Sequence, residues 1–248
     1  MKLLGNHGPA RPSGQTHTSG GKGDERSAVV GNEQLTTLAG AVLLVLIVVE
    51  LVTVPNLRTL LSVHVFIGIL LVGPLVIKLG STGYRFLRYY TRSSAFVRKG
   101  PPHLPLRLLA PLLVATTLLI VGSGIGLVVT GPEHPGSLLL VHGMSTLLWL
   151  PLIAIHVLAY LLRVPRSLAD DWSKHAGRRL VAGRGLRLGV NLGALLGGAI
   201  AAILVLPIAA PWSTWITATG NSPGPFLIIA GLLVAAFALL AAQLFRWR

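Results

Sequence analysis

Long apolar runs constrain this chain more than any other feature of its sequence. A helix needs about 20 mostly apolar residues to cross the hydrocarbon core of a bilayer. Six runs of this length occur, near residues 35–54, 59–79, 107–129, 137–162, 187–208 and 225–245. Only 11% of the 248 residues are charged, against roughly 25% in an average soluble domain. The sequence therefore predicts an all-α protein, a polytopic membrane bundle of six transmembrane helices.

The six runs divide the chain into segments of different composition. Residues 1–33 are rich in Gly, Ser, Thr and Pro and lack the layout of a cleavable signal peptide, so we expect a disordered tail. A four-helix membrane domain follows at 34–165, then a basic loop at 166–186. Two further transmembrane helices lie within 187–248. These last two runs contain no histidine, and we expect them to serve in helix packing or partner binding.

Lysine and arginine are distributed very unevenly between the loops. Twenty of the 21 lie in the tail, in the segments 78–107 and 163–187, or at the C-terminal end, whereas Arg58 lies in a loop of the opposite set. By the positive-inside rule, both termini and the two basic loops are cytoplasmic in a multi-pass protein of the plasma membrane. The net charge of +14 then reflects topology and attraction to lipid headgroups, and gives no separate support for nucleic-acid binding.

Three histidines lie inside the apolar runs. In the predicted topology, His64 and His142 share a depth near the outer side, where their helices can face each other. His156 follows His142 by fourteen residues, which places it about 21 Å deeper on nearly the same helix face. A histidine in a membrane either makes an interhelical hydrogen bond or holds a functional group. Three at this spacing favour axial ligation of haem, with one or two haems stacked across the membrane.

The chain has no cysteine, which rules out disulfides, thiolate-held iron–sulfur clusters and covalent c-type haem attachment. The segments VHGMSTLLWLPLIAIH (141–156) and SVHVFIGILL (62–71) resemble the haem-binding helices of membrane b-type cytochromes. The similar proteins are cytochromes b and b6 and, more loosely, the cytochrome b561-like anchor subunits. The resemblance covers about 35–165. It implies haem b, a quinone, and a membrane-associated oxidoreductase partner of the molybdopterin or hydrogenase type.

Lys78 stands where the resemblance would require a fourth histidine, fourteen residues after His64. A buried lysine can offer a neutral amine to iron beside His156, or it can extend as a cation toward the headgroups. Beyond Lys78, arginines and tyrosines recur at spacings of three or four, so we expect this helix to continue as a basic, aromatic segment. Arg85 and Arg107 would anchor the helices at the interface or pair with haem propionates or an acidic partner.

Glu50 is the one acidic residue inside a run, and it sustains a different hypothesis. With His64 and His142 it would form a metal-ion or proton transport site. A third alternative is a membrane anchor subunit without a cofactor. The sequence contains no phosphate-binding Gly loop and no nicotinamide fingerprint. We therefore expect an electron-transfer subunit of an oxidoreductase complex rather than a stand-alone enzyme.

Overall fold

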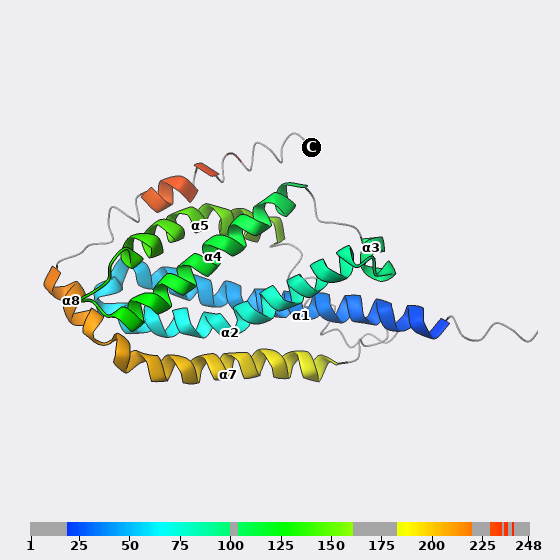
Figure 1. Ribbon diagram of the computed structural model, residues 1–248, viewed down its shortest axis with the longest axis horizontal. Coiled ribbons are helices and arrows are strands. Elements are labelled where there is room, and N and C mark those ends of the chain that lie inside the picture. Colours follow the sequence, from blue (N-terminus) through cyan, green and yellow to red (C-terminus); the bar gives the residue numbers. More distant parts are fainter. Residues whose placement is uncertain are drawn as a thin grey trace, which may run out of the picture.

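The computed structural model describes residues 19–99, 104–160 and 183–219, together with 229–234, 236–237 and 240. These residues form helices joined by turns, and no strand occurs among them (Figure 1). The described residues at 229–234, 236–237 and 240 are also helical. In chain order the elements are α1 (Ser19–Thr53), η1 (Val54–Asn56), α2 (Leu57–Tyr90), α3 (Ser94–Lys99), α4 (Leu104–Thr130), α5 (Leu138–Tyr160), α7 (Arg184–Ala209) and α8 (Pro211–Thr219).

Four helical stretches among the described residues are long and apolar enough to cross a membrane. They are Ser27–Tyr90, which contains both α1 and α2, and Leu106–Thr130, Leu138–Ala159 and Arg184–Ala209. In lipid, the backbone must satisfy its own hydrogen bonds, and helices of this length do so. The stretches support a multi-pass membrane protein. The predicted run at 225–245 and loop at 166–186 lie largely outside the described residues, and the count of six spans stays a prediction.

The outer surface of these helices is apolar, as expected of helices in lipid. Many large apolar side chains are exposed, such as Val129 at 75% and Leu186 at 73% of their full accessibility. The most buried positions include the small residues Ala39 and Ala202, both at 0%. Small residues let membrane helices approach closely, whereas large apolar ones face the lipid. The pattern is the opposite of that in a water-soluble bundle.

Two antiparallel hairpins make up most of the fold. η1 reverses the chain, so that Thr36 on α1 lies beside Lys78 on α2 and Glu50 lies beside His64. In the second hairpin, the indole of Trp149 on α5 donates to Thr117 Oγ1 on α4 at 2.9 Å. α1 packs along α2 and α4 along α5, but only a few contacts join α2 to α4. The two hairpins therefore leave a space between them.

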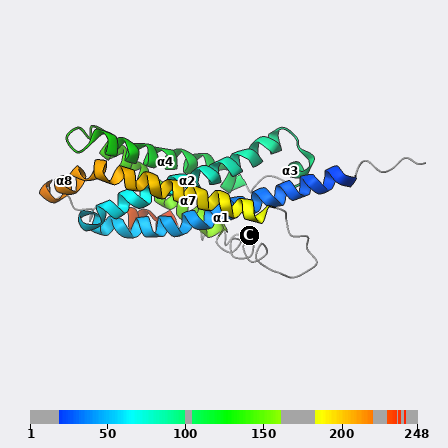
Figure 2. The ribbon, with the colours of Figure 1, turned by 90° about the horizontal axis from the view of Figure 1, so that it is seen from below.

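α7 packs along α2 through two glycines. A Cβ at Gly73 would collide with the carbonyl oxygen of Ala194, and one at Gly198 would lie 3.1 Å from the carbonyl oxygen of Leu70. The missing side chains permit this close approach of two backbones. α8 and the α4–α5 turn lie at one end of the molecule, and α3 lies at the opposite end (Figures 1 and 2).

The helical boundaries differ from the sequence predictions in two places. Residues 19–33, expected in a disordered tail, belong to α1, because α2 continues to Tyr90 as predicted and gives α1 a longer surface to pack against. Asn32 Nδ2 donates to the Ser81 carbonyl on that extension at 3.1 Å. Residues 211–219, which lie between the predicted membrane runs at 187–208 and 225–245, form α8. Pro211 suits a first helical position, and Trp212 Nε1 anchors α8 by donating to the Leu127 carbonyl of α4 at 2.9 Å.

Candidate functional site

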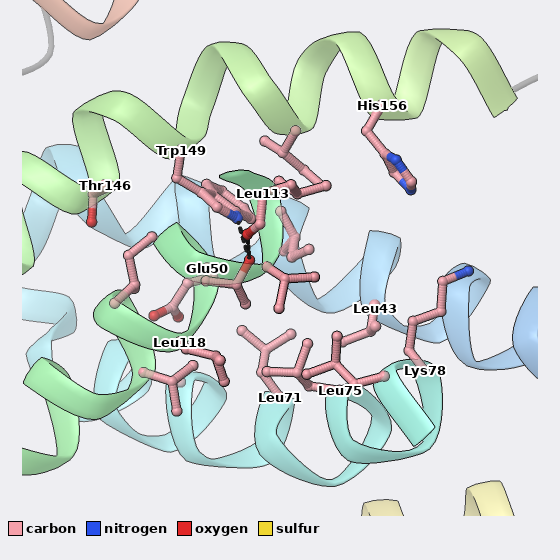
Figure 3. Close-up of a pocket in the computed structure, with 18 of the residues that line it drawn as sticks. Leu43, Glu50, Leu71, Leu75, Lys78, Leu113, Leu118, Thr146, Trp149 and His156 are labelled. Carbon is pink, nitrogen blue, oxygen red and sulfur yellow. Dashed lines mark hydrogen bonds between the residues drawn. The ribbon is translucent and has the colours of Figure 1, made fainter. Parts of the chain in front are cut away.

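A cavity of about 1760 Å³ occupies the space between the two hairpins. Ordinary small-molecule pockets have volumes of about 300–1,000 Å³, so this one has room for a large ligand or for more than one. Its middle is apolar, with Leu71 and Leu75 of α2 opposite Trp149 of α5 (Figure 3). Polar groups gather at its two ends. We call these the histidine end (His64, His142 and Glu50) and the basic end (Lys78, Arg85, Arg107 and His156, together with the acidic Glu33).

The histidine end brings together the two residues that the sequence placed at one depth. His64 comes from α2 and His142 from α5, and their ring centroids lie 6.4 Å apart with the planes at 86°. The predicted meeting of these two side chains is therefore present in the structure. Glu50 of α1, also expected at this depth, lies beside His64.

His64 is oriented through its Nδ1 atom. That nitrogen lies 3.0 Å from Glu50 Oε1 and 2.9 Å from Thr53 Oγ1. The Thr53 hydroxyl donates its hydrogen to the Glu50 carbonyl, so its oxygen accepts from the ring. This arrangement places the imidazole hydrogen on Nδ1 and leaves Nε2 as the nitrogen with a free lone pair.

His142 is oriented in the same way by different partners. Its Nδ1 lies 3.1 Å from both the Ile120 carbonyl oxygen and Ser123 Oγ of α4. A carbonyl can only accept, so Nδ1 again carries the hydrogen. Gly124 leaves room for the imidazole ring, because a Cβ at this position would lie 3.2 Å from His142 Cε1. Within the described part of the chain, neither Nε2 atom has a hydrogen-bond partner.

These features fit the axial ligation of a haem iron. Histidine ligands of metals almost always donate their other ring N–H to a carboxylate, a carbonyl or water, which fixes the tautomer, and both histidines do so here. Metal–nitrogen bonds of about 2 Å on each side, with the width of the imidazole ring, place the centroids of two axial histidines roughly 6 Å apart. His64 and His142 would hold the group through their Nε2 atoms, and the haem would supply one-electron chemistry.

At the basic end, the side chain of Lys78 contacts the backbone of α1. Its Nζ donates to the Thr36 carbonyl of α1 at 3.0 Å and lies over Gly40, where a Cβ would be 2.8 Å away. The side chain crosses the α1–α2 hairpin instead of reaching along α2 toward the headgroups. His156 and Lys78 point into the cavity from opposite walls (Figure 3).

The alternative metal site has less support from the geometry. Glu50 faces His64 Nδ1, on the opposite side of the ring from Nε2, so the carboxylate and the imidazole do not present ligand atoms to one point. Among the described residues, no group of three or more His, Asp and Glu side chains is placed to hold a metal ion.

Sequence reasoning missed the residues that orient the histidines. Thr53 and Ser123 are unremarkable polar residues in apolar runs, and Ile120 acts through its backbone. Glu50 lies four residues before the turn at residues 54–56 and His64 lies eight residues after it, so counting outward from the turn would not have paired them. No signal in the sequence marks Ile120 either.

Comparisons of the chain with models of protein families, with curated proteins and with solved structures found no match.

Proposed function

We propose that this chain is a membrane b-type haem protein that carries electrons, with His64 and His142 as the axial ligands of one haem. The observation that carries the proposal is that both imidazole rings use the same nitrogen, Nδ1, for hydrogen bonding. Each donates through Nδ1 to a partner on a neighbouring helix, so each keeps Nε2 for a ligand. An interhelical packing role would not require the same nitrogen to be free on both rings.

Several residues would prepare the site for this group. Glu50 and Thr53 hold one ring, and Ile120 and Ser123 hold the other, so the ligands are oriented before binding. Trp149 and the leucines of the cavity exclude water, and an apolar surrounding influences the reduction potential. The bound haem would supply one-electron transfer. The absence of cysteine requires the haem to be held without a covalent bond.

The proposal also includes the setting of this electron transfer. The basic end would face the cytoplasm, since Lys and Arg are concentrated there, and the histidine end would face the outer side of the plasma membrane. A quinone and a partner oxidoreductase would then exchange electrons through the haem. The molybdopterin or hydrogenase type of partner rests on the resemblance to cytochrome anchors alone.

The test is an absorption spectrum of the full chain, produced with ample haem and purified in detergent. We expect the dithionite-reduced protein to show a low-spin b-type spectrum, because two imidazoles give iron a strong axial field. Pyridine haemochrome analysis should give a haem-to-protein ratio near one. A folded but colourless protein would refute the proposal.

A further inference from the structure

We propose that the basic end of the cavity binds an anionic amphiphile, with Lys78 as the counter-ion of its acidic headgroup and the apolar cavity as the site of its chain. The anionic phospholipids of the surrounding membrane supply this chemistry. The inference concerns the end of the cavity opposite the paired histidines. It does not depend on a haem being bound between His64 and His142.

The first observation is that Lys78 lacks an anionic partner. Its ammonium lies within the bundle against Gly40, and its hydrogen bond goes to a neutral carbonyl, that of Thr36. No carboxylate of the described residues lies within ion-pair distance of it. Charges removed from water inside a membrane protein are generally paired, because an isolated one is strongly unfavourable. The structure therefore has a place for an anion.

The second observation is that two further cations line the same end. Arg85 of α2 and Arg107 of α4 both border the cavity, and neither pairs with a carboxylate in the described part of the chain. Arg107 Nη2 instead donates to the Tyr90 hydroxyl at 2.7 Å, which holds the guanidinium at the mouth. Guanidinium groups bind phosphate and carboxylate oxygens in a fork. Arg85 and Tyr90 follow Lys78 on α2 by seven and twelve residues, which is about 10 and 18 Å along the helix. The arginines therefore line the cavity from Lys78 to its mouth, and Glu33 of α1 is the acidic residue of this lining.

The third observation is the wall beyond these cations. Leucines of α1, α2 and α4 continue from Lys78 toward the middle of the cavity (Figure 3), namely Leu43, Leu71, Leu75, Leu113 and Leu118. A small inorganic anion would fill only the basic end and leave these side chains around empty space. An acyl chain attached to the anion would cover them. Cavity shape and charge together therefore favour an amphiphile.

The experiment measures lipid retention by native mass spectrometry on the full, haem-loaded chain, after incubation with phosphatidylglycerol or phosphatidylcholine. The variants are Lys78→Met, which removes the buried cation but keeps an unbranched side chain, and Arg98→Gln as a matched control. Arg98 is an exposed cation of α3 outside the cavity lining. Thermal unfolding with each lipid, and with inorganic phosphate, provides a second measurement.

We expect phosphatidylglycerol to be retained at least tenfold more weakly by Lys78→Met than by the wild type, since removing one partner of a buried charge pair typically has this effect or a larger one. Arg98→Gln should retain it normally. Equal retention by Lys78→Met would overturn the proposal, and equal stabilisation by inorganic phosphate would refute the need for a chain. A second haem equivalent that Lys78→Met removes would assign Lys78 to iron instead. The haem spectrum is read separately, so failure of the haem proposal would be seen independently.

Discussion

The two ends of the cavity are built by the same two helices at the same spacing, yet their side chains are prepared for different ligands. At the histidine end, α2 and α5 contribute His64 and His142, and neighbouring helices hold both rings through Nδ1. At the basic end, fourteen residues further along each helix, they contribute Lys78 and His156. There the cation is turned onto α1, where it meets a carbonyl.

This difference shows that the helical repeat alone does not define a haem site. A spacing of fourteen residues returns a side chain to the same face, and it does so at both ends of this cavity. What separates the ends is the set of partners on the adjacent helices. At the histidine end those partners hold both rings through Nδ1 and leave Nε2 of each ring for a ligand.

The largest expected effect comes from removing one histidine at each end. His142→Ala should abolish haem binding, because an iron with a single protein ligand loses affinity and its low-spin state. His156→Ala should keep the haem-to-protein ratio near that of the wild type. Pyridine haemochrome analysis of the two purified variants makes the comparison. Loss of haem in His156→Ala would contradict the proposal that the haem is held at the histidine end alone.

The orientation of the two ends gives the next prediction. The chain has no cysteine, so single cysteines can be introduced as reporters. Ser93→Cys, between α2 and α3 at the basic end, should be protected from a membrane-impermeant thiol reagent in intact cells. Ser222→Cys, beyond α8, should be labelled, and both should react after lysis. Labelling of Ser93→Cys alone would place the basic end outside and contradict the positive-inside assignment.

The sequence predicted an all-helical membrane protein and the meeting of His64 with His142, but it did not predict the residues that hold these two rings. Apolar length determines where a chain spans a membrane, and helical geometry determines which residues share a depth. By contrast, the role of Ile120 depends on a carbonyl whose position is set by how α4 and α5 pack. The direction of Lys78 depends on the absence of a side chain at Gly40, which is far away in the sequence.

A smaller effect is expected from Glu50→Gln, which keeps an acceptor beside His64 but removes the carboxylate. Loss of an outer-shell partner typically weakens metal affinity by about 10–100-fold, so haem should dissociate faster from this variant. A carboxylate also makes the imidazole a stronger donor to iron, so the midpoint potential should rise by tens of millivolts, where about 59 mV is a tenfold change for one electron. Spectroscopic redox titration measures this. The control is Glu33→Gln, because Glu33 also lies on α1 and lines the cavity but at the basic end. An equal shift of the midpoint potential in both variants would contradict the assignment of Glu50 as the partner of a haem ligand.

The smallest effect tests how closely α4 approaches the histidine end. A Cβ at Gly124 would lie 3.2 Å from His142 Cε1, whereas one at Gly122 would meet nothing within 4 Å. Both glycines lie in α4, so Gly124→Ala and Gly122→Ala change helix propensity equally. We expect Gly124→Ala to tilt the imidazole slightly and lower haem retention several-fold with a small shift of the reduced spectrum, because a rigid neighbour must yield by a few tenths of an ångström. Gly122→Ala should match the wild type. Identical spectra and haem retention in both variants would mean that the close approach of Gly124 does not set the position of His142, and that the hydrogen bonds with Ile120 and Ser123 of α4 orient this ring.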